Sequence, residues 1–556
     1  MFTKNSQNLQ HHLWARETNW RFGHHPVAQP AHYYKRNFYK SITPRLTIQN
    51  VDKPLAFLRK FTPDGSMLLA FAYEQRALEV YQYQGVGRVA HLLSSQKSEC
   101  ITAADHSLDS LHIRQQLFNA LFKKKYTIQL INASWSTRHV LDREFSIFLE
   151  NGRYVLLVSV AGGAILPSYQ AYQEYPDLFD DANLYDYTFH LVDLHKGCIS
   201  DTLRMEHDFI VLSHNHSVSV YGRTIAILST YRQCIELLEL DMEGKLQRLY
   251  TVGPYGSNLD RDQILAHQQM TTSTLDHTHS VPLSHFKQKI LAFIYNWALE
   301  APTECERKEK LKFFYKNFGL VERMLIMKMQ LIDSEHILMR YEKRQSQMPL
   351  EMLEGTVDSV TKNFKLYVFY NITEQKVLTI FGQNSVNMLL MLRNFCDEFR
   401  NVRSLYSWHA SSPSNNVYFR ESFDNDLKSF PGGIREAAAR ANPTLPISAQ
   451  NFSAIPYLDY SLFNYDHRFI SALERPRLIG MEPIRFRDRI TNILKFRVHL
   501  EHSSDTWQEY GMGNNPRDLV TFIFHPYEPF FISIQKFISR YVLNFHIYNT
   551  NTKVEP

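Results

Sequence analysis

The chain has 556 residues, of which 44% are apolar, 13% aromatic and 21% charged, a composition that supports a large core and excludes a disordered chain. Its five cysteines lie far apart and form no Cys-x-x-Cys pair, which argues against a disulfide framework or zinc ribbon and favours reduced thiols in the cytosol or nucleus. No run approaches about eighteen apolar residues and the N-terminus lacks an apolar signal core, so we expect neither a membrane span nor a secretory signal.

Basic charge is concentrated at the N-terminus. Residues 1–45 hold seven of the 61 Lys and Arg residues but one of the 56 Asp and Glu residues, so this segment carries +6 and the remainder −1. We therefore predict a basic N-terminal arm over residues 1–45 and a neutral body over residues 46–556. Such an arm indicates an acidic partner, nucleic acid or a solvated tail.

The arm contains the pattern of a short amphipathic helix. Leu9, Leu13, Arg16 and Trp20 recur at i, i+4, i+7 and i+11, which places them on one stripe of a helix. A helix this short is marginal alone in water, so we expect it to fold either against its own body or into a groove on a partner.

Aromatic and basic side chains alternate in residues 32–40, after that helix. Lys35, Arg36 and Lys40 are candidate contacts to nucleic acid or histones, because aromatic rings stack on bases and cations bind phosphate. The alternative is a linker that its aromatic side chains strap onto the body.

Three strands are predicted at residues 57–61, 67–73 and 78–83. A Pro-Asp-Gly turn at residues 63–65 separates the first two, the second is almost continuously apolar, and the third alternates with a period of two. Buried inner strands followed by an alternating outer strand are typical of a propeller blade.

The same pattern recurs at the C-terminus, where strands are predicted at residues 518–524, 530–535 and 541–548 around a His-Pro turn at residues 525–526. Two copies at opposite ends predict a ring closed by its own N- and C-terminal strands, which leaves only short, protected sheet edges. Two unrelated hairpins are the alternative.

Further strand groups lie between the two copies. A hairpin is predicted over residues 144–160 with Asn-Gly at its turn, and an apolar run at residues 289–297 is grouped with the strands. The other predicted strands are 187–194, 209–214, 218–221, 224–229, 234–240, 322–331, 336–341, 364–372, 457–463, 468–473 and 494–500. We therefore predict an all-β dominated fold, a WD40-like β-propeller of about seven blades, with inserted helices and a helical N-terminal arm.

Two insertions are predicted in the propeller, near residues 303–320 and 385–445. In the first, Leu311, Phe314, Tyr315 and Phe318 recur at i, i+3, i+4 and i+7, which indicates an amphipathic helix. The second begins with a predicted helix at residues 387–399 and continues as a polar, exposed stretch over residues 408–446.

Catalytic and metal-binding motifs are missing from the sequence. It contains no phosphate-binding loop, dinucleotide fingerprint, nucleophile elbow or His-Glu-x-x-His zinc motif. The doublets His214 with His216 and His277 with His279 have i, i+2 spacing but no cysteines or carboxylates at fixed spacing to complete a metal site. We expect no catalytic residues, no metal and no cofactor, and hence no enzyme.

Short phrases spread along the chain point to a family. They are Val-Asp-Lys-Pro at 51–54, Phe-Leu-Arg-Lys-Phe-Thr-Pro-Asp-Gly at 57–65, Val-Leu-Ser-His-Asn at 211–215, Leu-Pro-Ile-Ser-Ala-Gln at 445–450, Pro-Tyr-Leu-Asp-Tyr-Ser-Leu-Phe at 456–463, Leu-Glu-Arg-Pro at 473–476 and Phe-Ile-Phe-His-Pro-Tyr-Glu-Pro-Phe at 522–530. Together and in this order they resemble the De-etiolated-1 family. The arm and residues 241–281 depart most from the family's pattern.

The resemblance implies a nuclear, non-catalytic scaffold or substrate-receptor subunit of a cullin-4 RING ubiquitin ligase, which promotes protein ubiquitination and negatively regulates transcription through chromatin. The partners it implies are a damaged-DNA-binding-type cullin-4 adaptor, a small DDA-type subunit, the constitutive-photomorphogenic RING ligase and a ubiquitin-conjugating enzyme. No membrane partner is implied.

The arm supplies the candidate residues for the adaptor. Adaptor-binding subunits of these ligases often use a short helix resembling Leu-x-x-Arg-Glu, which here would be Leu13, Arg16 and Glu17. The predicted adaptor-binding residues are Leu9, Leu13, Trp14, Arg16 and Trp20. The alternative function is a chromatin-associated transcriptional repressor that contacts histones or DNA directly through Lys35, Arg36 and Lys40, for example at histone genes.

Overall fold

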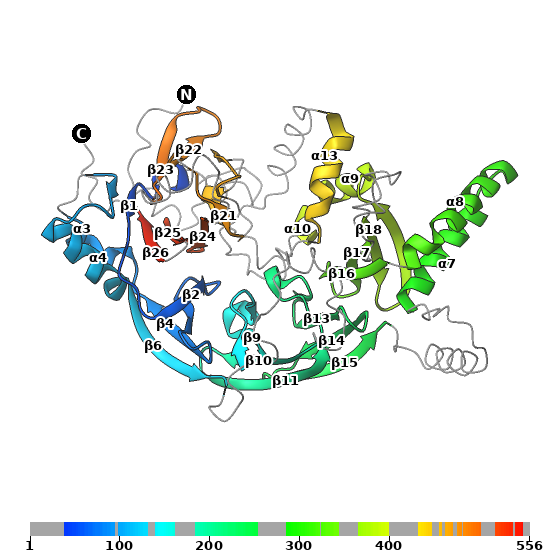
Figure 1. Ribbon diagram of the computed structural model, residues 1–556, viewed down its shortest axis with the longest axis horizontal. Coiled ribbons are helices and arrows are strands. Elements are labelled where there is room, and N and C mark those ends of the chain that lie inside the picture. Colours follow the sequence, from blue (N-terminus) through cyan, green and yellow to red (C-terminus); the bar gives the residue numbers. More distant parts are fainter. Residues whose placement is uncertain are drawn as a thin grey trace, which may run out of the picture. The chain divides into compact units, whose positions relative to one another are not determined.

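The fold is mostly β-structure, built from several antiparallel sheets (Figure 1). The computed structural model describes residues 38–94, 98–131, 139–161, 184–253, 285–322, 324–343, 365–399, 432–446, 455–458, 462–470, 475–480, 482–501, 518–537 and 540–548. The chain divides into two compact units, here called unit 1 and unit 2. Unit 1 comprises Met1–Gln129, Tyr406–Ser422 and Asn451–Pro556, and unit 2 comprises Leu130–Leu405 and Phe423–Gln450.

The first sheet of unit 1 confirms the three strands predicted near the N-terminus. Its strands, in the order in which they pair, are β2 (Ala56–Phe61), β3 (Met67–Ala72), β4 (Ala77–Tyr83) and β6 (Phe122–Gln129). The sequence analysis missed β6, because Lys123, Lys124 and Lys125 are exposed on this edge strand and hide its strand pattern. The helices between β4 and β6 are η1 (Val86–Val89), α3 (Ala90–Leu93) and α4 (Leu108–Leu121).

The second sheet of unit 1 joins the two ends of the chain. Strands β24 (Leu519–Phe524), β25 (Phe530–Lys536) and β26 (Tyr541–Ile547) follow the prediction. Strand β1 (Leu46–Ile48), which was not predicted, pairs antiparallel with β26, with Thr47 opposite His546. The two ends of the chain thus share a sheet, as the predicted closure requires, but this pairing does not by itself close a ring. Two short strands complete the sheet at its edges, β5 (Cys100–Ile101) beside β1 and β21 (Arg477–Leu478) beside β24.

The third sheet of unit 1 differs from the prediction. It consists of β20 (Phe463–Asn464), β22 (Ile484–Asp488) and β23 (Leu494–Val498). The predicted strand at 457–463 is wrong for most of its length, since η8 (Pro456–Leu458) is a 3₁₀ turn, and residues 468–470 form no strand. Strand β22 was not predicted, although Ile484 and Phe486 are buried and alternate with arginines, the pattern of a half-buried strand.

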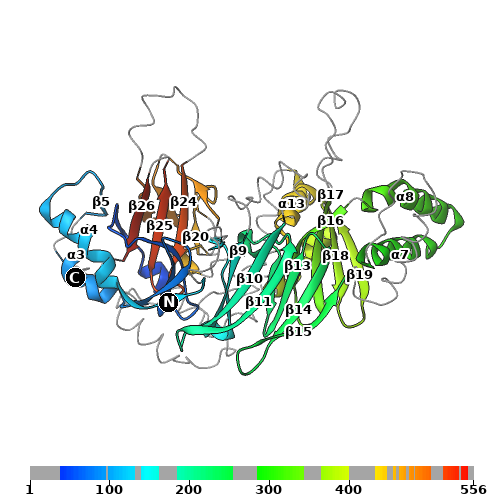
Figure 2. The ribbon, with the colours of Figure 1, turned by 60° about the horizontal axis from the view of Figure 1, so that its bottom comes forward.

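Unit 2 contains three sheets that follow one another along the chain (Figure 2). The first is β7 (His139–Leu141), β8 (Ile147–Leu149), β9 (Tyr154–Ala161), β10 (Tyr185–Asp193) and β11 (Cys198–Asp208). The second is β12 (Val218–Tyr221), β13 (Thr224–Ser229), β14 (Cys234–Leu240) and β15 (Leu246–Val252). The third is β16 (Met324–Leu331), β17 (His336–Lys343), β18 (Lys365–Asn371) and β19 (Lys376–Gly382).

The turn chemistry of unit 2 was largely predictable, but its outer strands were not. The β8–β9 hairpin is confirmed, with Asn151 at φ 56° and Gly152 at φ 94° in its turn. The predicted strand at 209–214 is wrong: the 3₁₀ turn η4 (Ser213–Asn215) closes this segment, and β15 is the fourth strand instead. Strand β15 is exposed on both faces, so the alternation that marks a half-buried strand is missing.

Helices cover or extend the third sheet of unit 2. They are α7 (His285–Leu299), α8 (Glu304–Glu322), α9 (Val386–Asn394), α10 (Cys396–Phe399), α13 (Gly433–Ala441) and the 3₁₀ turn η6 (Asn442–Thr444). Helix α8 confirms the helix predicted from residue 303, and α9 with α10 confirms the one predicted at 387–399. The apolar run at 289–297 lies in α7, so grouping it with the strands was wrong.

The predicted exposed stretch at 408–446 is partly corrected. Residues 408–431 lie outside the described residues, but Ala437, Ala438 and Leu445 are buried. Asn442 donates its side-chain amide to the carbonyl oxygens of Gln383 and Ser385, both at 2.9 Å. This end of the segment is therefore packed against its own unit.

Consecutive sheets of each unit share hydrophobic cores. One core in unit 1 joins β2–β4 with β1 and β24–β26, and another joins β20, β22 and β23 with β24 and β25. In unit 2 the first and second sheets share one core, and the second and third share another. The described strands thus form six sheets rather than about seven, and no closed propeller is detected among them. Within this part of the chain, no helix is long and apolar enough to cross a membrane.

Two sheets repeat the same buried Ser-His pair. In unit 2, Ser159 Oγ lies 2.7 Å from His190 Nε2, and in unit 1, Ser533 Oγ lies 2.9 Å from His546 Nε2. In both sheets the histidine lies on the neighbouring strand, two residues beyond the partner of the serine in the ladder. The two sheets therefore contain the same buried Ser-His contact between neighbouring strands, as expected of repeated structural units.

The turns of the first and last hairpins of unit 1 pack against each other. His525 Nε2 lies 3.0 Å from the carbonyl oxygen of Gly65, and the imidazole ring lies 5.0 Å from the ring of Phe61. Tyr83 stacks on Phe530 at 5.6 Å. The two sequence copies thus meet through their turn residues.

Replacing Gly65 tests this contact. Gly65 has φ +74°, and a Cβ atom added there would lie 2.5 Å from His525 Nε2, so Gly65→Ala combines backbone strain with a clash in a packed turn. We expect it to lower the free energy of unfolding by about 2–3 kcal/mol in urea titrations. The matched control is Gly87→Ala, where the added Cβ meets no atom within 4 Å and the change should stay within about 0.5 kcal/mol. Equal unfolding midpoints for the two variants would contradict the packing of these turns.

Candidate interaction site

The described root of the N-terminal arm is anchored in unit 1. Residues 38–41 are helical, and Phe38 and Tyr39 are buried. The Tyr39 ring meets the Tyr457 ring edge-on at 5.3 Å, and its hydroxyl donates to the carbonyl oxygen of Tyr527 at 2.6 Å. Tyr457 in turn donates its hydroxyl to the carbonyl oxygen of Ile42. The root of the arm is therefore fixed at both of its aromatic positions.

Lys40 is also committed to the body. Its ammonium lies 3.1 Å from Asp488 Oδ2, and the two side chains are only 19% and 6% exposed. Burial by itself raises the pKa of Asp488, but the backbone amides of Thr491 and Ile490 and the Lys40 ammonium together lower it to about 2. The carboxylate thus stays charged and holds Lys40, which favours the strap alternative for this part of the aromatic and basic segment.

The other predicted site residues cannot be placed. Lys35 and Arg36 and the five predicted adaptor-binding residues lie outside the described residues. They are Leu9, Leu13, Trp14, Arg16 and Trp20. The described part of the arm begins at Phe38, which is buried in unit 1.

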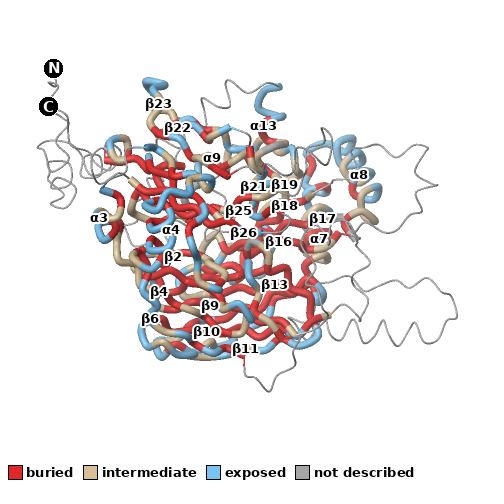
Figure 3. The backbone as a smooth tube through the Cα atoms, turned by 60° about the vertical axis from the view of Figure 1, so that its left-hand side comes forward, coloured by how far each residue is buried: buried red, intermediate tan, exposed pale blue. Residues whose placement is uncertain are grey.

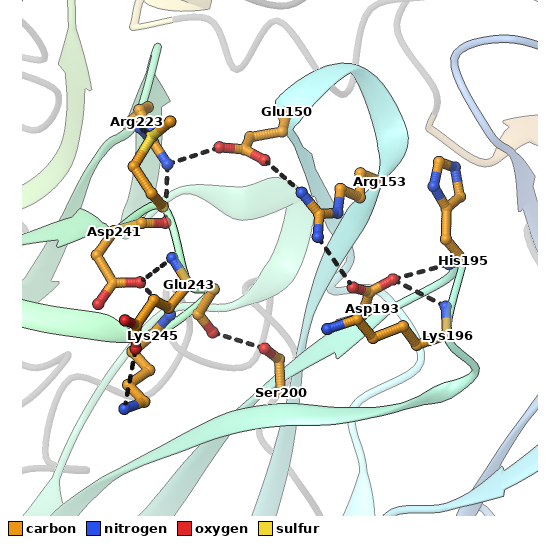
Figure 4. A network of polar contacts seen from close by, with 12 residues as sticks. Glu150, Arg153, Asp193, His195, Lys196, Ser200, Arg223, Asp241, Glu243 and Lys245 are labelled. Carbon is orange, nitrogen blue, oxygen red and sulfur yellow. Dashed lines mark hydrogen bonds and ion pairs between the residues drawn. The ribbon is translucent and has the colours of Figure 1, made fainter.

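A polar network in unit 2 connects four strand turns (Figure 4). Arg223 Nη2 lies 2.8 Å from Glu150 Oε1 and donates to the carbonyl oxygen of Asp241 at 2.7 Å. Arg153 lies 3.8 Å from Glu150 and 3.6 Å from Asp193. These charged groups link the first and second sheets of the unit at one end.

The carboxylates of this network close their own turns. Asp193 accepts hydrogen bonds from the backbone amides of His195 and Lys196 at 2.9 and 3.0 Å. Asp241 accepts from the amides of Glu243 and Lys245, and the Lys245 amide is the main cause of its lowered pKa. Carboxylates bound to turn amides and arginines are suited to holding turns in place. The network is therefore suited to holding the turns of the first and second sheets of unit 2 together.

The histidine doublets do not assemble a metal site in the described part of the chain. His216 is buried, and His277 and His279 lie outside the described residues. Within the described ranges no group of three or more His, Cys, Asp or Glu side chains is placed to hold a metal ion.

Comparison with known proteins identifies the family. The model of the family described as De-etiolated protein 1 Det1 matches residues 143–549. The chain belongs to the Det1 family. The protein is similar to the "Light-mediated development protein DET1" of Solanum lycopersicum, with 26% identity over 535 residues, and to that of Arabidopsis thaliana, with 26% over 549 residues. Each alignment covers 92% of this chain and 94% of the relative.

Solved structures are only distantly similar to this Det1-family chain. A luciferin-regenerating enzyme aligns with TM-score 0.24 and 7% identity, over 60% of this chain and 64% of its own. The periplasmic gluconolactonase of Pseudomonas aeruginosa aligns with TM-score 0.20 and 12% identity, over 36% and 40%. Similarity this low does not bear on fold or function.

The family phrases lie at packing contacts in the Det1-family structure. Tyr457, in the phrase at 456–463, forms the socket for the arm root. His525 and Tyr527, in the phrase at 522–530, contact Gly65 and Tyr39. Leu445, in the phrase at 445–450, accepts a hydrogen bond from buried Arg340. These phrases therefore identify the family largely through the residues that hold its sheets and segments together.

Three aromatic residues of α7 and α8 are exposed, and of these the sequence had singled out only Tyr315, as part of an apolar helical stripe. Trp297 on α7 and Phe313 and Tyr315 on α8 are 46%, 57% and 67% exposed. For α7 the available signal was the spacing of Phe286, Ile290, Phe293 and Trp297 at i, i+4, i+7 and i+11, which is typical of a helix. The nearly continuous apolar run at residues 289–297 favoured a strand instead.

Proposed function

We propose that this Det1-family protein is a non-catalytic scaffold and substrate-receptor subunit of a nuclear cullin-4 RING ubiquitin ligase, which promotes ubiquitination and negatively regulates transcription. Family membership over residues 143–549 carries the proposal. The anchored arm root supports it, because a segment that starts from a fixed point on a folded body is suited to recruiting a partner by folding on it. Protein association, not catalysis, is the proposed activity.

The proposed partners follow from the family resemblance. They are a damaged-DNA-binding-type cullin-4 adaptor, a small DDA-type subunit, the constitutive-photomorphogenic RING ligase and a ubiquitin-conjugating enzyme, with histones or chromatin as further contacts. The adaptor is assigned to the predicted arm helix, at Leu9, Leu13, Trp14, Arg16 and Trp20. Within the family we propose an insect member related to the protein called abnormal oocyte, because the arm departs most from the family's pattern.

We further propose that the sheets are blades of a WD40-like propeller. Consecutive sheets share cores in each unit, β1 completes the sheet of the C-terminal strands, and two sheets repeat the same Ser-His pair. A propeller presents several loops and edges on one rigid body, which suits a scaffold with several partners.

Leu13→Asp tests the adaptor assignment. Placing a carboxylate on the apolar stripe replaces an apolar anchor with a charge, so we expect recovery of the adaptor and cullin in affinity purification of the full chain to fall at least tenfold. Gln10→Asp is the matched control, since it adds the same charge off the stripe and should leave recovery unchanged. Equal recovery with both variants would remove the arm stripe from the adaptor interface.

The same purification discriminates the alternative function. The arm's charge of +6 favours a chromatin-associated repressor that contacts histones or DNA, although Lys40 is paired with Asp488. If the full chain recovers histones or DNA but neither adaptor nor cullin, the ligase proposal fails and the repressor takes its place. A direct DNA contact must then weaken steeply with salt, because each neutralised phosphate releases counterions.

A further inference from the structure

Helices α7 and α8 form a hairpin that extends from the third sheet of unit 2 (Figures 1 and 2). Its base is packed on the sheet, where the Phe286 ring lies edge-on to Tyr370 at 5.1 Å and Ile290 is buried. The seam between the helices contains Phe314, 5.4 Å from the Tyr295 ring. The hairpin therefore has its own apolar seam.

Trp297 and Phe313 are among the large aromatic side chains of the hairpin that are exposed outside that seam. Trp297 is 46% exposed and Phe313 is 57% exposed, on helices whose tube in Figure 3 is mostly exposed or intermediate. Lys310 places its ammonium 4.3 Å from the centre of the Trp297 ring, so the exposed edge of α7 and the Lys310–Phe313 flank of α8 are next to each other. Exposed aromatic side chains are characteristic of interface anchors.

Lysines lie close to these anchors on α8. The segment 310–316 of α8 contains three lysines and no acidic residue, whereas the acidic residues Glu304, Glu306 and Glu309 lie in the turns before it. Lys310, Phe313 and Lys316 follow one another at i+3 intervals, which makes each the neighbour of the next on the helix surface. Glu306 and Glu309 lie on the same flank one turn earlier, so the excess of positive charge is confined to the end that carries Phe313 and Lys316. We name Trp297, Lys310, Phe313 and Lys316 the aromatic-lysine surface. Its chemistry is complementary to carboxylates interleaved with apolar side chains.

We propose that the aromatic-lysine surface binds an acidic amphipathic helix of a partner protein, which would pack as a third helix on the hairpin. Apolar side chains of the bound helix contact Trp297 and Phe313, and its carboxylates pair with Lys310 and Lys316. A protein segment is favoured over nucleic acid, because the glutamates before residue 310 limit the positive stretch to about two helical turns. The inference rests on the proposed scaffold function and specifies the chemistry of one partner.

Fluorescence anisotropy on the full chain tests the proposal. The probe is a labelled synthetic amphipathic helical peptide with leucines on one face and glutamates on the other. A second peptide carries lysines in place of the glutamates, and a DNA duplex serves as the nucleic-acid probe. We expect the glutamate peptide to bind at least tenfold more tightly than the lysine peptide, with affinity that falls as salt is raised.

Variants of the surface locate the binding. Phe313→Ala and the pair Lys310→Glu with Lys316→Glu should each weaken binding of the glutamate peptide at least tenfold. Tyr315→Ala is the matched control, because Tyr315 is 67% exposed and, two residues from Phe313, points to the opposite flank of α8. Its loss should change binding less than twofold. No binding of the glutamate peptide, equal loss with Tyr315→Ala, or preferential binding of DNA would each overturn the proposal.

Peptide binding and adaptor recovery test the two proposals independently. Phe313→Ala should leave recovery of the cullin-4 adaptor unchanged, whereas Leu13→Asp should lower it at least tenfold without changing affinity for the glutamate peptide. Failure of the wild-type chain to recover the adaptor would overturn the ligase proposal, while the peptide measurements decide the aromatic-lysine surface.

Discussion

Lowering the pH from 7 to 4.5 is expected to destabilise unit 1 by about 5 kcal/mol, because two buried histidines are held in the neutral form. Burial lowers the pKa of His525 to about 4 and that of His546 to about 3. In the unfolded chain a histidine titrates near 6.5, so the unfolded state binds more protons below that pH. The stabilisation is complete above about pH 6.5 and is lost as the pH falls toward 4.

The contacts of the two rings explain this preference. His525 Nδ1 accepts hydrogen bonds from the backbone amides of Tyr527 and Glu528 at 3.1 and 2.8 Å, so Nε2 carries the proton and donates to Gly65. A second proton on Nδ1 would break both amide contacts. His546 is fully buried between the hydroxyls of Thr47 and Ser533. Among the described residues, no carboxylate hydrogen-bonds either ring, so the charged imidazolium form is not stabilised.

Urea unfolding at several pH values between 7 and 4.5 checks this result. Two histidines give a steepest slope of about 2.7 kcal/mol per pH unit. His546→Gln should roughly halve the slope, whereas His112→Gln, at an exposed position of α4, should retain it. A free energy of unfolding that stays constant between pH 7 and 5 would contradict the prediction.

Arg340→Ala is expected to destabilise unit 2 by about 3–5 kcal/mol, because it breaks a buried ion pair and its hydrogen bonds. Arg340, on β17, is 4% exposed. It donates to the carbonyl oxygens of Pro443 and Leu445 at 3.0 and 3.1 Å, and its Nη2 lies 2.6 Å from Glu342 Oε1. Removing the guanidinium leaves two carbonyls and a largely buried carboxylate without this donor.

Urea unfolding and limited proteolysis together measure the effect. Cleavage by trypsin at Arg435, on α13, should accelerate in Arg340→Ala, since the residues after α13 lose their attachment to β17. Arg340→Lys should be intermediate, because a single ammonium cannot reproduce the planar fork of donors. The control is Lys376→Ala in the same sheet, whose pair with Glu374 is 61% and 54% exposed and should contribute at most about 0.5 kcal/mol. A loss in Arg340→Ala no larger than that of this control would show that the pair does not hold the segment.

The most predictable elements are those whose signal is local. Strands β2–β4 and β24–β26 follow from apolar runs bounded by Pro-Asp-Gly and His-Pro turns, and α8 follows from its helical spacing. The meeting of the two chain ends in one fold could also be predicted, because both ends carry the same strand pattern.

The elements that failed depend on their surroundings. Strand β15 is exposed on both faces and belongs to its sheet only through its hydrogen bonds to β14. Helix α7 is apolar enough to read as a strand, and packing on Tyr370 and on α8 decides that it is helical. Intrinsic preference is a weak guide where tertiary contacts choose between two such states.

By itself the sequence determined the β-rich class, the inserted helices, the basic arm and the family, because turn residues, periodicity and charge are local properties of a chain. Only the tertiary structure decided that Lys40 pairs with Asp488, that His525 reaches Gly65 and that Trp297 lies beside Lys310. These partners are separated by 448, 460 and 13 residues of sequence. Contacts of this kind depend on how whole sheets and helices pack, and no local pattern of residues encodes them.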